Sequence, residues 1–336
     1  MNMSPGASRR SFALRRVMRA ALLASSALCV GLPAQAAEFP TDRPVTVVVG
    51  FVAGGASDSA TRLIAGKLAE NLGLSIAVQN RAGAGGNIAH QYVANAPADG
   101  TTLLLGSVGP LTISPHMTAL PYDPFKDLAA VSGGVHFPNM LVAHKAAGVR
   151  NFAEFVALAK RGDKHADFAS SGVGSASHMA GELLNLHAGV NMVHVPYKGG
   201  AQAMQDLIGE RVTSYFSAPP TALPYVQSGQ LIPLATTGLQ RPAYLPDVPT
   251  VAESGYPGFE ALNWYSFMAP GKTPEPILDR WNQEIVKVLK DPGVQASLNK
   301  LGLTPHPTTR QEFTDFMRAE FEKWGRIIRE RDIKMN

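Results

Sequence analysis

The stretch that decides the fold reads Pro44-Val-Thr-Val-Val-Val-Gly-Phe-Val-Ala-Gly-Gly-Ala-Ser-Asp58. Its β-branched, apolar first half predicts a buried strand over residues 44–51. Gly54-Gly55 ends the strand, and Ser57 or Asp58 can cap the helix that follows, which is expected to end at Gly73. A glycine turn that opens a helix offers free N–H groups and the positive end of the helix dipole, so it suits an anion. An ordinary strand–helix connection that binds nothing has the same local pattern.

The strand–turn–helix order continues beyond this stretch. Residues 75–79 read as a second strand, the glycine-rich turn 80–88 leads into a helix ending at Ala94, and residues 101–106 read as a third strand. This alternation predicts a mostly parallel sheet with helices on its faces, in which ligands lie at the carboxyl ends of the strands.

A second α/β set follows in the middle of the chain. Residues 108–138 read as irregular, with a short strand near 130–132, whereas 140–144, 166–170, 191–195, 212–216 and 231–236 read as strands separated by helices. An aromatic strand over 260–269 is expected to return to the first lobe, before helices over 276–289, 294–301 and 311–331. The last helix carries an apolar stripe that predicts core packing against the first lobe.

The N-terminus has the pattern of an export signal. Ser8-Arg9-Arg10-Ser11-Phe12-Ala13 is a twin-arginine pattern, followed by an apolar run over 20–32 and the small-residue site Ala34-Gln35-Ala36. A Sec-type leader with a basic start is the alternative. Residues 1–37 are therefore expected to be a signal peptide that directs the chain to the periplasm.

Removing this leader changes the charge of the chain. The 336 residues carry a formal net charge of +4, but residues 1–37 hold five arginines and no acid, which leaves 25 basic and 26 acidic residues and a net charge of −1. Binding of nucleic acid through excess positive charge is therefore not expected. The single cysteine, Cys29, lies in the leader, so the mature chain has neither a thiol nor a disulfide.

The sequence offers no strong catalytic or metal-binding motif. It contains no G-x-S-x-G, P-loop or H-E-x-x-H pattern, and we expect no catalytic residue, cofactor or metal. His178 and Glu182 could bind a metal as an i, i+4 pair, although a structural capping histidine explains the pair as well. A periplasmic hydrolase that uses Ser175 and His178 is the alternative enzyme interpretation, but no third, orienting acid is evident.

The candidate ligand-binding residues are neutral hydrogen-bond donors in loops at predicted strand ends. A carboxylate can be held by such donors without a buried arginine. Two lobes joined by crossing strands also imply closure about a hinge. The candidates are Ala53, Gly54, Gly55, Ala56, Ser57, Gly86, Asn87, Ser107, Ser171, Gly174, Ser175, Ser177, His178 and Tyr197, and the family resemblance of the five segments quoted next adds Ser217.

Five segments along the mature chain resemble the Bug family, the extracytoplasmic solute receptors of tripartite tricarboxylate transporters. They are Phe51-Val-Ala-Gly-Gly-Ala-Ser-Asp58, Gln79-Asn-Arg-Ala-Gly-Ala-Gly-Gly-Asn87, Ser171-Gly-Val-Gly-Ser-Ala-Ser-His-Met-Ala-Gly-Glu182, His194-Val-Pro-Tyr-Lys-Gly-Gly200 and Leu245-Pro-Asp-Val-Pro-Thr-Val-Ala-Glu-Ser-Gly255.

The resemblance implies a two-lobed periplasmic binding protein fold of type II. Lobe 1 would comprise residues 38–139 and 260–336, and lobe 2 residues 140–259. It implies a periplasmic receptor that holds a small carboxylate in the cleft and passes it to two integral membrane subunits. A monomer is expected as the default for a shuttle protein. A sensor that presents its liganded form to a membrane signalling protein shares the binding step.

The chain departs from the family pattern at two places. Val52-Ala53 stands where Pro-Pro often precedes the double glycine, and Thr213 and Ser217 replace two acids near the strand after the Tyr197-Lys-Gly-Gly helix. An acid in the cleft commonly pairs with a ligand amino group. Its loss at Ser217 favours a plain or aromatic carboxylate over an amino acid.

Overall fold

The structure is a computed structural model that describes residues 39, 43–162, 166–331 and 333. The predicted signal peptide, residues 1–37, lies outside the described residues and stays a prediction. Among the described helices, none has the length and apolar character needed to span a membrane.

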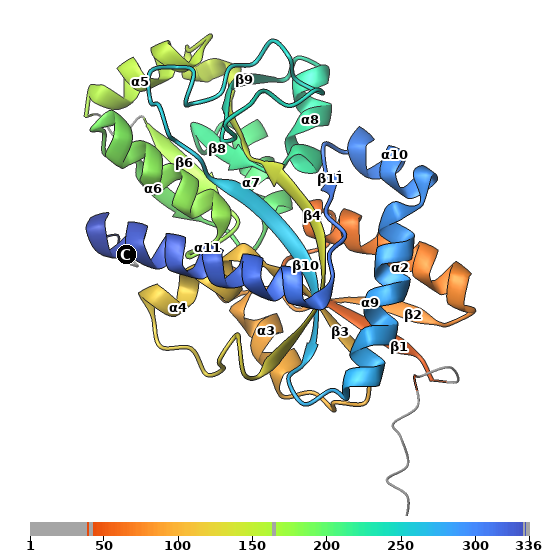
Figure 1. The fold of residues 1–336 in the computed structure, drawn as a ribbon. Helices are drawn as coiled ribbons and strands as arrows, with labels where there is room; N and C mark the ends of the chain where they lie inside the picture. Colours follow the sequence, from red (N-terminus) through yellow and green to blue (C-terminus); the bar gives the residue numbers. More distant parts are fainter. Residues whose placement is uncertain (1–38, 40–42, 163–165, 332, 334–336) are drawn as a thin grey trace, which may run out of the picture. The chain divides into compact units, whose positions relative to one another are not determined.

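The first sheet has six strands in the order β11-β4-β10-β3-β1-β2 (Figure 1). β1 pairs in parallel with β2 and β3, as the strand–turn–helix order predicts, whereas β10 is antiparallel to β3 and β4. The strand bounds are β1 (Val45–Val49), β2 (Ile76–Asn80), β3 (Thr102–Ser107), β4 (Leu128–Pro138), β10 (Leu262–Pro270) and β11 (Thr304–Pro305).

The second sheet has five strands in the order β7-β6-β8-β5-β9. β6 is parallel to β7 and β8, and β5 is antiparallel to β8 and β9. The bounds are β5 (Met140–His144), β6 (Asp167–Ser170), β7 (Val193–Pro196), β8 (Ser214–Ser217) and β9 (Leu231–Thr236). The two-lobed α/β fold is confirmed. Both sheets are mixed rather than mostly parallel, because strands at the crossings between the sheets run against their neighbours.

The chain crosses between the sheets twice. β4 continues directly through Asn139 into β5, and the segment after β9 returns the chain to β10. The predicted lobe boundaries fall beside these two crossings and remain a prediction.

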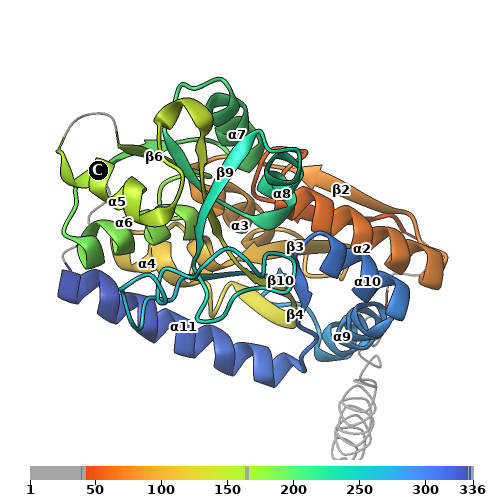
Figure 2. The same cartoon turned by 90° about the horizontal axis from the view of Figure 1, so that it is seen from above.

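Helices cover both faces of each sheet (Figure 2). On the first sheet, Val47 and Val49 face a core formed with α2 (Ala56–Leu72), α9 (Glu275–Lys290) and α10 (Pro292–Lys300). On the second sheet, α7 (Gly200–Ile208) and α8 (Pro219–Gln227) cover one face, and α5 (Phe152–Lys160) and α6 (Ala176–Ala188) cover the other. The remaining helical segments are η1 (Ala84–Gly86), α3 (Asn87–Ala94), η2 (Gly109–Ile113), α4 (Ser114–Met117), η3 (Lys145–Ala147) and α11 (Arg310–Arg331).

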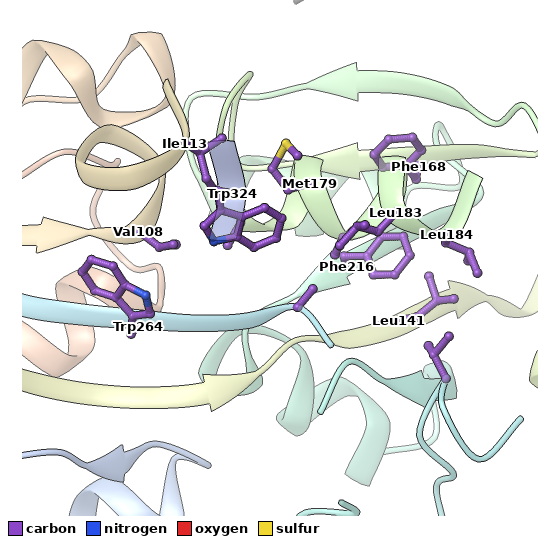
Figure 3. Packing of buried hydrophobic residues seen from close by; sticks show 14 of the residues in the cluster. Val108, Ile113, Leu141, Phe168, Met179, Leu183, Leu184, Phe216, Trp264 and Trp324 are labelled. Carbon is purple, nitrogen blue, oxygen red and sulfur yellow. The ribbon is translucent and has the colours of Figure 1, made fainter. Parts of the chain in front are cut away.

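One hydrophobic cluster extends from the first sheet to the second. Figure 3 shows Trp324 of α11 between Ile113 of η2 and Met179 of α6, with Phe168 and Phe216 beyond them. The stripe on α11 is therefore core packing, as predicted, but it contacts elements of both sheets. Figure 1 shows α11 running alongside both.

Residues 108–138 differ most from the sequence prediction. They contain η2, α4 and the eleven-residue strand β4, where an irregular segment with a short strand was expected. Gly133 and Gly134 lie inside β4. A Cβ at Gly133 would come within 2.4 Å of the His306 carbonyl oxygen, so this position of the strand requires glycine. Glycine here therefore permits close approach of another backbone rather than ending the strand.

Candidate ligand-binding cavity

A cavity lies where the ends of both sheets meet. The volume open to the centre of a water molecule in it is about 30 Å³. Seven of the fifteen predicted residues line it, from three different loops: Gly55, Ala56, Ser57, Ser107, Ser171, Ser175 and Ser177.

Four helices begin at the wall of this cavity. α2 starts after Gly55 and α6 after Ser175, while Gly200 is the first residue of α7 and Ala218 precedes α8. The first turns of α2, α6 and α7 have N–H groups without an intrahelical acceptor, and each helix N-terminus carries the positive end of the dipole. α8 begins with Pro219 and Pro220, which have no N–H, so it contributes its dipole alone. No Asp, Glu, Lys, Arg or His is among the described residues that line the cavity. The wall therefore attracts an anion through neutral donors alone.

The first loop is held in shape by Asp58. The carboxylate of Asp58 accepts the N–H of Gly54 at 3.1 Å, the Arg62 guanidinium at 2.9 Å and the Asn80 amide at 3.0 Å. Burial alone would raise the pKa of Asp58, but hydrogen bonds from Arg62, Gly54 and Asn80 outweigh it and keep the pKa below its usual value. The prediction that Ser57 or Asp58 caps α2 is wrong, because Gly55 is the N-cap and Asp58 stabilises the loop from the first turn.

The second loop is held by its own serines. Ser175 is the N-cap of α6 and accepts the His178 N–H at 3.3 Å, while the Ser177 hydroxyl accepts the Ser171 N–H at 2.9 Å. Ser175 Oγ and Ser177 Oγ lie 3.0 Å apart. These bonds fix the first turn of α6 against the end of β6.

The ring of His178 holds this loop through a bond to Gly174. Its Nδ1 accepts the Gly174 N–H at 3.2 Å, and its ring stacks on His194 at 4.0 Å. Burial, with repulsion from His194, lowers the pKa of His178 to about 3, so the ring is neutral. The structure thus shows a capping histidine. Its Nε2 lies 3.7 Å from Glu182, and no group of three metal-ligating side chains occurs among the described residues.

The remaining eight predicted residues lie outside the cavity lining: Ala53, Gly54, Gly86, Asn87, Gly174, His178, Tyr197 and Ser217. Several are engaged elsewhere. Tyr197 donates to Asp206 at 2.8 Å, Ser217 donates to the Ala218 carbonyl at 3.1 Å, and Asn87 donates to Ala84 and Ser114. The Ser217 hydroxyl is bonded to its own neighbour and does not line the cavity. The charge of the preferred ligand therefore depends on the residues that do line it.

The cavity is closed by interlocking glycines. An added Cβ at Gly109 would lie 2.5 Å from the Gly174 carbonyl oxygen, and one at Gly85 would come still closer to the Val173 carbonyl oxygen. A Cβ at Gly199 would lie 2.8 Å from the Val52 side chain. Loops next to the first sheet therefore touch loops next to the second through bare backbone, which is the geometry of a closed cleft.

Sequence reasoning missed the lining residues that the strands supply. Asn139 lies at the β4–β5 crossing, Asn263 and Tyr265 lie on β10, and Tyr215 lies on β8. Burial raises the pKa of Tyr215 and of Tyr265 above the usual range, so both stay protonated. The only signal in the sequence was a lone amide, Asn139, between apolar strand residues.

Known proteins with similar sequences share this fold. BugT of Bordetella pertussis is 34% identical over 308 residues, which are 91% of this chain and 94% of that protein. The solved structure of Rpa4515 from R. palustris with adipate has a TM-score of 0.85 at 33% identity, covering 88% of this chain and 99% of that one. MatC from Rhodopseudomonas palustris with bound malate has a TM-score of 0.82 at 32% identity, with coverage of 86% and 100%.

Fold and cavity together define a two-lobed solute-binding protein of the periplasmic type. Residues 60–333 match the family described as "Tripartite tricarboxylate transporter family receptor", and the chain belongs to this family. It is accordingly a receptor rather than an enzyme.

Proposed function

We propose that this receptor closes on one small organic acid without an amino group and delivers it to two integral membrane subunits of a tripartite transporter. The observation that carries the proposal is the convergence of the N–H-bearing N-termini of α2, α6 and α7, with the dipole of α8, on one cavity whose described lining has no charged side chain. Residues 53–57, Ser107 and 171–177 would form its donor loops, with Gly86, Asn87, His178, Tyr197 and Ser217 supporting them.

The chemistry of the wall favours a carboxylate over an amino acid. Helix N-termini and hydroxyls donate hydrogen bonds to carboxylate oxygens. An ammonium group buried there would need an acceptor of negative charge, because an unpaired buried charge is costly. The related proteins solved with adipate and malate hold acids of the proposed class.

Closure and export complete the proposal. The glycine contacts across the cleft would form when the ligand shifts an open–closed equilibrium. The chain would act in the periplasm as a monomer after export by the twin-arginine route through Arg9 and Arg10.

Thermal unfolding of the mature chain tests the proposal. The panel contains aromatic acids, di- and tricarboxylates, nicotinate and acidic amino acids. A ligand that binds only the folded state raises the melting temperature, by about 5 °C at a concentration 100 times its Kd. We expect at least one non-amino acid to do so. Tighter binding of aspartate or glutamate contradicts the ligand class. No shift, with no acid released on denaturation by mass spectrometry, contradicts the receptor proposal.

A further inference from the structure

The side-chain amide of Asn139 is a buried donor on the cavity wall that the protein itself does not satisfy. Asn139 is 0% exposed, and its Nδ2 has no hydrogen-bond partner among the described residues. The hydroxyl of Ser107, another lining residue, is also buried and has no hydrogen-bond partner among the described residues. Leaving such groups unbonded costs about 1–3 kcal/mol each. Two of these groups on one wall point to a ligand that bonds them.

The neighbouring Asn263 sets the orientation of this amide. Asn263 Nδ2 lies 3.4 Å from Asn139 Oδ1, which leaves Asn139 Nδ2 as the free group. If both amides were rotated by 180°, Asn139 would donate to Asn263, and Asn263 Nδ2 would be the free group. In either orientation the pair offers an N–H donor to the cavity that both residues line.

The backbone of Asn139 belongs to the hinge. Its N–H donates to Thr237 Oγ1 at 2.8 Å, and its carbonyl accepts the Thr237 N–H at 3.0 Å. Thr237 in turn exchanges bonds with Ala261, donating from its hydroxyl at 2.7 Å and accepting the Ala261 N–H at 2.9 Å. The two chain crossings are thus tied together at Asn139. A ligand bonded to its side chain would be held by the hinge as well as by the loops that close.

We infer that Asn139 is a specificity-determining residue that donates from its amide to a second oxygen group of the bound acid. This inference rests on the proposed function and deepens it. One carboxylate would be held by the helix N-termini, and a second oxygen function, such as a further carboxylate, would meet Asn139 and Ser107 at the hinge wall. The receptor then discriminates against acids whose other end is a hydrocarbon, because these leave the Asn139 donor buried and unpaired.

Binding of matched acids to the mature chain tests the inference. The probes are adipate and L-malate, which have a second oxygen function, and hexanoate and butyrate, which share their carbon counts and lack it. In Asn139→Ala, the affinity for the two diacids should fall about 10- to 100-fold, as for a hydrogen bond to a charged group, and the affinity for the monoacids should change less than twofold. Asn139→Asp keeps the shape and adds a like charge, so it should weaken diacid binding further.

Thr237→Val provides the matched control. It removes the two hinge bonds made by the Thr237 hydroxyl, which Asn139→Ala leaves in place, and Thr237 is not among the described residues that line the cavity. It should therefore weaken all four acids by the same factor, which is the signature of a purely structural role.

Each remaining outcome decides the matter. Equal losses for diacids and monoacids in Asn139→Ala, or no loss at all, overturn the inference and leave the receptor proposal intact. The same holds if the wild type binds monoacids but neither diacid. Failure of every carboxylate to bind overturns both.

Discussion

Three histidines are kept uncharged around the loops of the cavity. His90 is fully buried between the Gly86 carbonyl at 2.9 Å and the Ser107 N–H at 3.4 Å. Burial lowers its pKa to about 4, although the bond to Gly86 opposes the shift. Burial likewise lowers the pKa of His178 to about 3 and of His194 to about 4. Their neutrality is part of what positions Ser107 and the α6 loop.

Lowering the pH should therefore destabilise the protein at pH values well above those at which its carboxylates titrate. In the unfolded chain a histidine has a pKa near 6.5, so between about pH 6.5 and 4 the unfolded state binds more protons. The stabilisation is complete above pH 6.5 and is lost as the pH falls towards these lowered values. Denaturant titrations at pH 7 and 4.5 should show that His90→Gln loses about 2 kcal/mol less stability over this interval than the wild type. Parallel curves would contradict the assignment.

At this scale the sequence predicts loops better than strands. Gly55, Ser57, Ser175 and Ser177 are found because glycine and serine at strand ends are a local pattern. Asn139 could not be placed in the cavity, because its position follows from the pairing of β4 with β10. Tyr197 and Ser217 carry hydroxyl donors, as expected of ligand-binding residues. Their hydroxyls, however, donate to the Asp206 carboxylate and to the Ala218 carbonyl.

Among the elements, η2 contributes directly to closure. All three nearest atoms to a Cβ at Gly109 belong to Gly174 and Ser175, on the far side of the cleft. The backbone of Gly109 lacks a positive φ, so alanine is tolerated there as long as the cleft is open.

Gly109→Ala should bias the protein towards the open form. We expect an unchanged or slightly raised melting temperature without ligand and at least tenfold weaker binding of the acid that gives the largest thermal shift, measured by calorimetry. Gly66→Ala on α2 is the matched control, because a Cβ there meets nothing within 4 Å. The control should bind like the wild type. Wild-type affinity in Gly109→Ala would show that this contact is not part of closure.

Predictability differs among the elements for a physical reason. β5 and β9 have the predicted bounds, because each is a run of apolar residues that ends at a polar one. β4 was predicted as a short strand near 130–132 only, because Ser132-Gly133-Gly134 reads as a loop. In the fold these glycines pass close to the backbones of β10 and of the segment after β11. A contact between segments so distant in the sequence leaves no local trace.

For the whole molecule, the interlocked loops offer a way to fix the closed form. An ideal Cβ at Gly174 lies 3.8 Å from the Ser114 Cβ, a separation typical of disulfides. The only cysteine of the chain is Cys29 in the predicted leader, so Ser114→Cys with Gly174→Cys would create the only thiols of a chain from which residues 1–37 have been removed.

The double cysteine variant should be locked by oxidation. Gly174 has a φ of +74°, so some strain is expected from its cysteine. We expect oxidised, ligand-free protein to take up no added acid in equilibrium dialysis, and reduction to restore uptake. The single variant Ser114→Cys should bind in both states. Unimpaired uptake by the crosslinked protein would contradict closure across this contact.

The neutral wall of the cavity also bears on energy coupling. Both tyrosines on the wall stay protonated, and the described lining has no imidazole, carboxyl or amine. Capture of an anion at neutral pH therefore exchanges no proton with the wall, and the loaded receptor differs in charge from the empty one by the charge of its cargo. Any ion gradient that drives uptake would accordingly act on the membrane subunits, with the receptor serving as an electrically passive carrier.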